Sequence, residues 1–327
     1  MAKVIYYNID DNLDYEQKLL AEWGVHDIEL IERKDPDRTV EMTKAVQDAD
    51  GLVVEYDQVT AERMEHLPQL KIVALQSIGY NNVDSPAATA HGVCVTNIPG
   101  FCTEEVATHT IGMLLALSRQ ITFLDRTVRA GKWDPLLGYG MHRLSGKIFG
   151  MVFFGSIPKA MLPILKALGM EVMAYAPTKT TEYLAEFGVQ KAETLDELCE
   201  KADVVSMHCP MNDVTKNMMG KAQFAKMKPS AFFINTARGG VVDESALVEA
   251  LKTGEILGAA VDVIADEATE KSELFALDNT VITPHAAFLS VDSFYNGRKL
   301  ALEQLVQRLS KKQRPENLIN KDVEIAF

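Results

Sequence analysis

Short runs of β-branched and aromatic residues alternate with amphipathic stretches along the chain. In the first hundred residues the runs KVIYYNI, GLVVEY and KIVALQS are apolar at nearly every position. Strands of this kind are buried on both faces, as in a parallel sheet. Segments with helical spacing of apolar residues, or turns, separate them. This alternation predicts βαβ units, with helices covering both faces of the sheet.

A long apolar segment beginning at Thr103 interrupts this rhythm and predicts one long helix. A second series of strands follows, with the sequences KIFGMVFF, EVMAYA, ADVVSMHC, SAFFINTA, ILGAAVDV and NTVITP. A last helical stretch runs from about Ser290 to Leu309, before a polar tail. The two series predict an α/β protein with two doubly wound parallel-sheet domains, the second inserted before the chain returns to the first.

Composition and charge narrow the class of protein. The chain has 327 residues, enough for two domains, and a formal net charge of −13. This charge disfavours binding to nucleic acid or to an anionic membrane. No apolar run is long enough to span a membrane, and acidic residues occupy the place of a signal peptide's apolar region. We therefore expect a cytoplasmic protein.

The cysteines agree with that expectation. They show neither CxxC pairing nor zinc-ligand spacing, and they are Cys94, Cys102, Cys199 and Cys209. We expect isolated thiols in a reducing compartment and no metal site.

The segment GMVFFGSIPKAM, residues 150–161, lies where a strand passes into a helix, the place of a dinucleotide-binding glycine loop. Phe153 and Pro158 stand where the first and third glycines of the fingerprint belong, and only Gly155 remains. Proline is tolerated in the first turn of a helix. The N–H groups of Ser156 and Ile157, with the Ser156 hydroxyl, remain as candidate pyrophosphate ligands. We expect weaker or altered cofactor binding.

The following strand lacks the acidic residue that binds the adenosine ribose in NAD-specific sites. That acidic residue would stand about twenty residues after the loop, at the position that Ala176 occupies here. Thr178 and Lys179 follow, and they offer a hydroxyl and a positive charge to a 2′-phosphate. The sequence therefore makes NADP plausible. An ordinary solvated turn lysine at position 179 is the alternative.

The downstream motifs INTARGGVVDESALVEAL, GAAVDVIADE and ITPHAAF, with SIGYNNVD and ADVVSMHCPMNDVTKNMMG upstream, resemble the D-isomer-specific 2-hydroxyacid dehydrogenase family. The resemblance implies a hydride transfer between NAD or NADP and a small D-2-hydroxy acid or 2-keto acid. It implies a flavodoxin-like substrate domain, residues 1–99 plus 298–327, and a Rossmann dinucleotide-binding and dimerisation domain, residues 100–297. It also implies a homodimer, with the long helix after Thr103 in the interface, although that helix suits a core position nearly as well.

The same resemblance gives three residues a catalytic role. Arg238 follows an apolar strand, and its guanidinium can bind the substrate carboxylate and carbonyl together. His285 also follows a strand and can exchange a proton with the substrate oxygen. Glu267 would orient the histidine and raise its pKa. The family's proline after this glutamate is Ala268 here, which changes the local loop sequence.

Further positions are assigned by resemblance. Ser77, Ile78 and Gly79 belong to the turn that binds the substrate carboxylate, through the N–H groups of Ile78 and Gly79. Asp262 would bind the nicotinamide carboxamide, and His109 would be structural. The remaining cofactor-binding candidates are His208, Cys209, Pro210, Thr215, Thr236 and Ala237.

Substrate choice is only weakly encoded. Glu55 and Tyr56 end a strand of the first domain, and Glu55 would disfavour a substrate with a second carboxylate unless its side chain faces solvent. This favours monocarboxylates such as glyoxylate, hydroxypyruvate or pyruvate. A dinucleotide-sensing corepressor of the same fold, with weak or no turnover, is the alternative function.

Overall fold

The computed structural model describes residues 1–9, 12–35, 41–55, 57–138 and 141–325. The chain divides into two compact units. Unit 1 comprises Met1–Phe101 and Ser290–Phe327, and unit 2 comprises Cys102–Leu289. The expected boundary after residue 297 would cut helix α12 (Val291–Leu309) in two. The whole helix belongs to unit 1, because its apolar residues, Leu302 and Leu305 among them, lie in the core of that unit.

Unit 1 is built on a five-stranded parallel sheet. Its strands are β1 (Ala2–Tyr7), β2 (Ile28–Arg33), β3 (Gly51–Val54), β4 (Ile72–Leu75) and β5 (Cys94–Thr96). They pair in the order β2-β1-β3-β4-β5. Alternate residues enter two cores, so that Tyr6 lies in one and Tyr7 in the other.

Helices cover both faces of this sheet. Helices α1 (Asp14–Glu22) and α12 pack on one face, and α2 (Met42–Ala45), α3 (Ala61–Glu65) and α4 (Ser85–Ala90) on the other. A buried ion pair joins α1 to α12, with Arg298 Nε donating to Glu16 Oε1 at 2.7 Å. This pair links the C-terminal helix to the N-terminal part of the unit.

Unit 2 is built on a seven-stranded parallel sheet. Its strands are β6 (Ile148–Val152), β7 (Glu171–Tyr175), β8 (Gln190–Lys191), β9 (Val204–Met207), β10 (Phe232–Asn235), β11 (Gly258–Val261) and β12 (Thr280–Ile282). The order is β12-β11-β10-β9-β6-β7-β8. Two doubly wound parallel sheets, as the sequence predicts, are confirmed. Only the short edge strand β8 lies outside that prediction.

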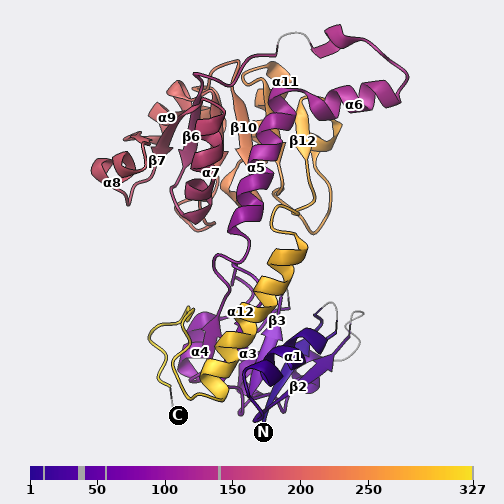
Figure 1. Ribbon diagram of the computed structural model, residues 1–327, viewed down its shortest axis with the longest axis vertical. Coiled ribbons are helices and arrows are strands. Elements are labelled where there is room, and N and C mark those ends of the chain that lie inside the picture. Colours follow the sequence, from indigo (N-terminus) through magenta and orange to yellow (C-terminus); the bar gives the residue numbers. More distant parts are fainter. Residues whose placement is uncertain (10–11, 36–40, 56, 139–140, 326–327) are drawn as a thin grey trace. The chain divides into compact units, whose positions relative to one another are not determined.

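Two layers of helices enclose the second sheet (Figure 1). Helices α5 (Thr103–Ser118) and α7 (Ser156–Ala167) pack on one face, where Phe149 and Met151 point. Helices α9 (Leu195–Lys201), α10 (Lys221–Phe224) and α11 (Glu244–Thr253) pack on the other, where Val152 points. The helix α8 (Thr181–Glu186) follows β7. The inner strands are therefore buried on both faces, which explains their nearly continuous apolar sequences. The short edge strand β8 is polar and has no buried residue.

The segment after Thr103 is two helices, so the prediction of one long helix is wrong. Gln120 has a left-handed backbone, with φ of +52°, and it ends the helical path between α5 and α6 (Ile121–Arg129). Helix α5 buries a full apolar face, whereas α6 has no buried residue. Helix α5 is thus a core helix, and the uncovered apolar residues belong to α6. In the described part of the chain no helix has the length and apolar character needed to cross a membrane.

Candidate active site

The loops that follow strands β6, β7, β9, β10, β11 and β12 all lie at one edge of the unit 2 sheet, the carboxyl edge, because the strands are parallel. The strand order reverses between β6 and β9. Ligands of open α/β sheets bind at such a switch point. The fold thus gathers at this edge every predicted cofactor-binding residue, together with Arg238, Glu267 and His285.

The loop after β6 keeps the backbone shape of a glycine loop without its first glycine. Phe153 adopts a left-handed backbone with φ of +74°, and its N–H donates to Tyr175 O at 2.8 Å. Gly155 is the N-cap of the 12-residue helix α7, and a Cβ added there would meet no atom within 4 Å. The N–H groups of Ser156 and Ile157 open this helix, where helix geometry leaves them without an intrahelical acceptor. Open space above an exposed helix N-terminus fits a pyrophosphate.

Two lysines gather beside the loop that follows β7. Ala176 is buried and carries no carboxylate. The Lys179 ammonium lies 5.1 Å from the centre of the Tyr183 ring, and the Lys159 ammonium lies 5.3 Å from the same ring. Among the described residues, neither ammonium group is within 4 Å of a carboxylate. Lys159, in the first turns of α7, escaped the sequence analysis because only the fold brings it to α8.

The loop after β9 carries His208, Cys209 and Pro210. Burial lowers the pKa of His208 to about 3, so the ring is neutral, and its Nε2 has no partner among the described residues. Burial raises the pKa of the Cys209 thiol to about 11, which removes it as a nucleophile at neutral pH. Thr215 is fully buried and donates its hydroxyl to Pro210 O at 2.6 Å. Thr215 therefore shapes this loop and does not offer its hydroxyl proton to a ligand.

Arg238 follows β10 in a turn that the neighbouring chain holds tightly. The Asn235 side chain accepts from Ala237 N at 3.0 Å and donates to Arg238 O at 2.9 Å. The Arg238 guanidinium is half-buried and donates to Ala237 O at 2.6 Å. A Cβ at Gly239 would lie 1.7 Å from Ile264 O, so only glycine permits this approach of the β10 and β11 loops.

Glu267 and His285 form a contact at the same edge. Glu267 Oε2 lies 2.8 Å from His285 Nδ1, and the two side chains are 45% and 40% exposed. His285 has a left-handed backbone, with φ of +53°. Because Nδ1 faces the carboxylate, Nε2 is the ring atom left to exchange a proton with a ligand. The pair stands in the geometry of an oriented general acid.

Asp262, at the end of β11, holds the turn that carries His285. Its backbone oxygen accepts from His285 N at 2.7 Å. Its carboxylate accepts from Ala286 N at 2.9 Å and from Ala287 N at 3.0 Å, and it also accepts the Thr283 hydroxyl. The side chain is almost fully buried. Asp262 is thus an internal support of the histidine turn, a role that the sequence analysis missed.

The predicted substrate turn lies in unit 1, after β4. Its carbonyl oxygens are occupied: Ser77 O accepts from Ile98 N, Ile78 O from Asn97 Nδ2 and Gly79 O from the Ser77 hydroxyl. The N–H groups of Ile78 and Gly79 have no acceptor within the part of the chain that the structure describes. The two N–H groups are therefore available to a ligand, as the prediction of a carboxylate-binding turn requires.

The residues named for substrate choice follow β3 in the same unit. Glu55 O accepts from Asn82 Nδ2 at 3.2 Å, and Tyr56 lies outside the described residues.

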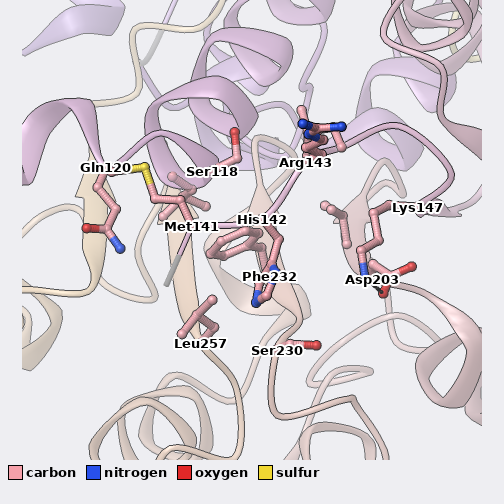
Figure 2. Close-up of a pocket in the computed structure, with 13 residues that line it drawn as sticks. Ser118, Gln120, Met141, His142, Arg143, Lys147, Asp203, Ser230, Phe232 and Leu257 are labelled. Atoms are coloured by element: carbon pink, nitrogen blue, oxygen red, sulfur yellow. Dashed lines mark hydrogen bonds and ion pairs between the residues drawn. The ribbon is translucent and has the colours of Figure 1, made fainter. Parts of the chain in front are cut away.

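A cavity of about 120 Å³ in unit 2 lies elsewhere (Figure 2). It is lined by residues at the beginnings of strands, such as Val204 and Phe232, and by the end of α5 and the segment from Met141 to Lys147. It is therefore at the amino edge of the sheet, opposite the candidate active site. None of the predicted site residues lines it.

Known proteins resemble the chain over nearly its whole length. The family model described as D-isomer specific 2-hydroxyacid dehydrogenase, NAD binding domain, matches residues 111–287. A glyoxylate reductase of Thermococcus litoralis is 38% identical over 91% of this chain and 92% of its own. The TT0316 protein of Thermus thermophilus is 32% identical, with a TM-score of 0.86 over 97% of this chain and 99% of its own. The D-lactate dehydrogenase of Escherichia coli is 30% identical, with a TM-score of 0.81 over 97% and 99%.

Proposed function

The chain belongs to the D-isomer-specific 2-hydroxyacid dehydrogenase family, and on that premise we propose that it reduces small 2-keto monocarboxylates to D-2-hydroxy acids. It is an oxidoreductase that acts on a CH–OH group with a nicotinamide cofactor. The observation that carries the proposal is the Glu267–His285 contact of 2.8 Å at the same sheet edge as Arg238. These residues supply the proton donor and the carbonyl polariser that ketone reduction needs.

The roles of the residues follow from their positions. A nicotinamide cofactor, when bound, supplies the hydride. Arg238 binds the substrate carboxylate and polarises the keto oxygen, for which a planar guanidinium fork is suited. His285 holds a proton at Nε2 and donates it to that oxygen, while Glu267 at Nδ1 fixes the orientation of the ring. In unit 1, we propose that the open N–H groups of Ile78 and Gly79 bind a carboxylate.

Turnover of a substrate panel tests the proposal. Purified protein is mixed with NADPH or NADH and with glyoxylate, hydroxypyruvate or pyruvate, and absorbance at 340 nm is followed. The name of the T. litoralis relative makes glyoxylate the first compound to test. We expect oxidation of the cofactor with at least one of the three. Cofactor binding without any turnover would overturn the proposal and favour a dinucleotide-sensing binding protein.

We further propose that NADPH is the preferred cofactor. Ala176 offers no carboxylate to repel a 2′-phosphate, and Lys159 and Lys179 both lie near the Tyr183 ring without a carboxylate partner among the described residues. Two cations that are not neutralised favour a doubly charged phosphate over a ribose hydroxyl. The exposed Thr178 supplies a hydroxyl nearby.

Titration of both cofactors into three variants tests the preference. We expect Ala176→Asp to weaken NADPH binding and improve NADH binding. Lys159→Gln and Lys179→Gln should each weaken NADPH binding about tenfold and leave NADH binding unchanged. Lys166→Gln, on the same helix as Lys159 but bound to Phe187 O, is the matched control. Equal or better NADPH binding by Ala176→Asp would refute the preference.

We also propose a homodimer formed through α6 and the segment that follows it. Helix α6 buries none of its own residues, and Trp133 and Leu136 are 87% and 72% exposed. Apolar residues left uncovered over a continuous segment mark an interaction surface. Sedimentation velocity should give twice the mass of the chain, and Trp133→Ser combined with Ile121→Ser should shift it to the monomer. A monomeric wild-type protein would contradict the proposal.

The four cysteines support a reducing location. All of them are free and buried, and burial raises the pKa of the Cys102 and Cys199 thiols to about 12. Four cysteines without a disulfide agree with the cytoplasmic location that we propose.

A further inference from the structure

Two threonines stand at equivalent places in the two loops that carry the catalytic side chains. Thr236 precedes Arg238 by two residues at the end of β10, and Thr283 precedes His285 by two residues at the end of β12. Strand β11 lies between these strands in the sheet. A single element that held both threonines would fix the spacing of Arg238 and His285 across three strands.

Helix α5 holds both of them through adjacent residues. Thr110 Oγ1 lies 2.9 Å from Thr236 Oγ1, and His109 Nε2 lies 3.0 Å from Thr283 Oγ1. Neighbouring residues on an α-helix point about 100° apart. Residues 109 and 110 can therefore reach the two outer strands of the three, β12 and β10.

The direction of each hydrogen bond follows from the protons available. The Thr110 hydroxyl donates to Val106 O at 2.7 Å, and a hydroxyl has one proton, so Thr236 is the donor to Thr110. Each of the two hydroxyl groups therefore has a defined acceptor. Thr110 itself is fully buried.

The direction of the hydrogen bond between His109 and Thr283 follows in the same way. The Thr283 hydroxyl donates to Asp262 Oδ1, so Thr283 accepts from His109, whose proton must sit on Nε2. Asp262 in turn accepts from the N–H groups of Ala286 and Ala287, beside His285. His109 thus supports the histidine turn through Thr283 and Asp262.

We propose that His109 and Thr110 are a positioning pair that sets the separation of His285 and Arg238, with each residue supporting one of the two loops. The proposal rests on the proposed function, because it assigns the loops to catalysis. Helix α5 suits this role: it has 16 residues, and eight of them are buried in the core of unit 2. Both residues act through the loops, and neither is proposed to contact the reacting atoms.

The proposal predicts that the two residues act separately. Thr110→Val keeps the shape of the side chain and removes its hydroxyl, so the β10 loop with Arg238 loosens and the KM for the keto acid rises about fivefold. His109→Phe removes the donor to Thr283, so the β12 loop with His285 loosens and kcat falls about fivefold. Thr110→Ser and His109→Gln, which restore the hydroxyl and a donor near the Nε2 position, should return both constants to within twofold of wild type.

Hydrogen–deuterium exchange of the full-length protein without substrate is the deciding measurement, because it needs no turnover. We expect faster exchange at residues 284–289 in His109→Phe only, and at residues 236–241 in Thr110→Val only. Thr236→Val breaks the Thr110–Thr236 bond from its other end and replaces Thr110→Val if that variant does not fold. Thr108→Val is the control, because Thr108 is exposed and its hydroxyl bonds Glu104 O and Glu105 O within its own helix.

Two outcomes would overturn the pair: unchanged exchange in both loops, or an equal increase in both loops in each variant. A wild-type protein that reduces no 2-keto acid would overturn the proposed function instead, and the exchange pattern would still decide whether α5 holds the two loops separately.

Discussion

Two loops at the carboxyl edge of the unit 2 sheet use the same unusual backbone for different ends. Phe153 after β6 and His285 after β12 are both non-glycine residues in the left-handed region, with φ of +74° and +53°. At Phe153 the ring packs against the core, and the phosphate-binding groups that we propose are backbone N–H groups further along. At His285 the ring itself is the group that we propose to react, with Glu267 at its Nδ1 and with Asp262 O accepting from its backbone N–H.

The difference explains which positions of the family pattern this chain changes. A loop that works through its backbone needs a conformation, and Phe153 can supply that conformation at a cost of about 1 kcal/mol. A loop that works through a side chain needs the residue and its supports together. The fingerprint glycine at 153 is thus replaceable, whereas the triad of Arg238, Glu267 and His285 is complete.

Removal of the reactive ring should have the largest effect. We expect His285→Ala to lower kcat about a thousandfold, the usual contribution of a general acid, while NADPH binding stays within twofold. Steady-state kinetics and fluorescence titration measure the two quantities. His142→Ala, in the cavity at the opposite edge, should leave both unchanged. A loss of less than tenfold in His285→Ala would show that the side chain of this loop is not the reactive one.

Two glycine-to-alanine variants test different properties of their loops. Gly239→Ala tests close packing of the backbone, and Gly155→Ala tests access of the cofactor. In Gly239→Ala the new methyl group would lie 1.7 Å from Ile264 O, so we expect a loss of about 3 kcal/mol in unfolding free energy. In Gly155→Ala the methyl group meets no atom within 4 Å, so stability should stay constant. Its NADPH affinity should nevertheless fall about tenfold, because the methyl group occupies the path of the pyrophosphate.

Urea unfolding and cofactor titration distinguish these two variants. Equal losses of stability in both would contradict the open space at Gly155. Unchanged NADPH binding in Gly155→Ala would place the pyrophosphate elsewhere.

Strand β9 lies between β12 and β6 in the sheet, and the loop after it carries His208. This histidine should make the stability of the protein depend on pH. Burial lowers the pKa of His208 from 6.5 to about 3, so between these values the unfolded chain binds a proton that the folded chain does not. Stability must therefore fall as the pH falls through this range, by at most about 1.4 kcal/mol per pH unit from this residue. Above about pH 7.5, where the unfolded histidine is also neutral, the residue should contribute almost no slope.

Urea unfolding of wild type and His208→Gln at pH 7.5, 6 and 5 measures this contribution as the difference between the two slopes. His142→Gln serves as the exposed control. Identical slopes in His208→Gln and wild type would show that the His208 ring is accessible to protons in the folded protein.

Phe153→Gly should have the smallest effect. It tests directly whether the loop after β6 works through its backbone and the loop after β12 through its side chain. Glycine relieves a left-handed backbone worth about 1 kcal/mol, while loss of the partly buried ring costs a similar amount. We expect stability to change by less than about 1 kcal/mol and the Kd for NADPH by less than about threefold. Phe154→Ala, in which the buried neighbour is truncated, should lose about 3 kcal/mol. A large loss of cofactor affinity in Phe153→Gly would mean that the ring itself serves the ligand.

The sequence predicts the fold well because strand burial leaves a local signal. Alternate residues such as Met151 and Val152 enter opposite cores, and both must be apolar. The break at Gln120 leaves no such signal, since neither glycine nor proline stands there. The positions of Lys159 and His109 depend on contacts with residues far along the chain, Phe187 and Thr283, which no local pattern encodes. The roles of the site residues remain predictions that the variants above test.

The insertion of unit 2 into unit 1 governs the order in which the chain can fold during synthesis. Strands β3 and β4 pack against α12, which is synthesised later. The edge strand β5 is bound by another late residue, Asn320, whose side chain bonds Val95 N and Val93 O at 2.8 Å each. All of these late partners leave the ribosome after unit 2 is complete. Unit 2 can therefore fold first, as a contiguous segment, while one apolar face of unit 1 stays uncovered. Until α12 emerges, that face is apolar surface on which the nascent chain can aggregate.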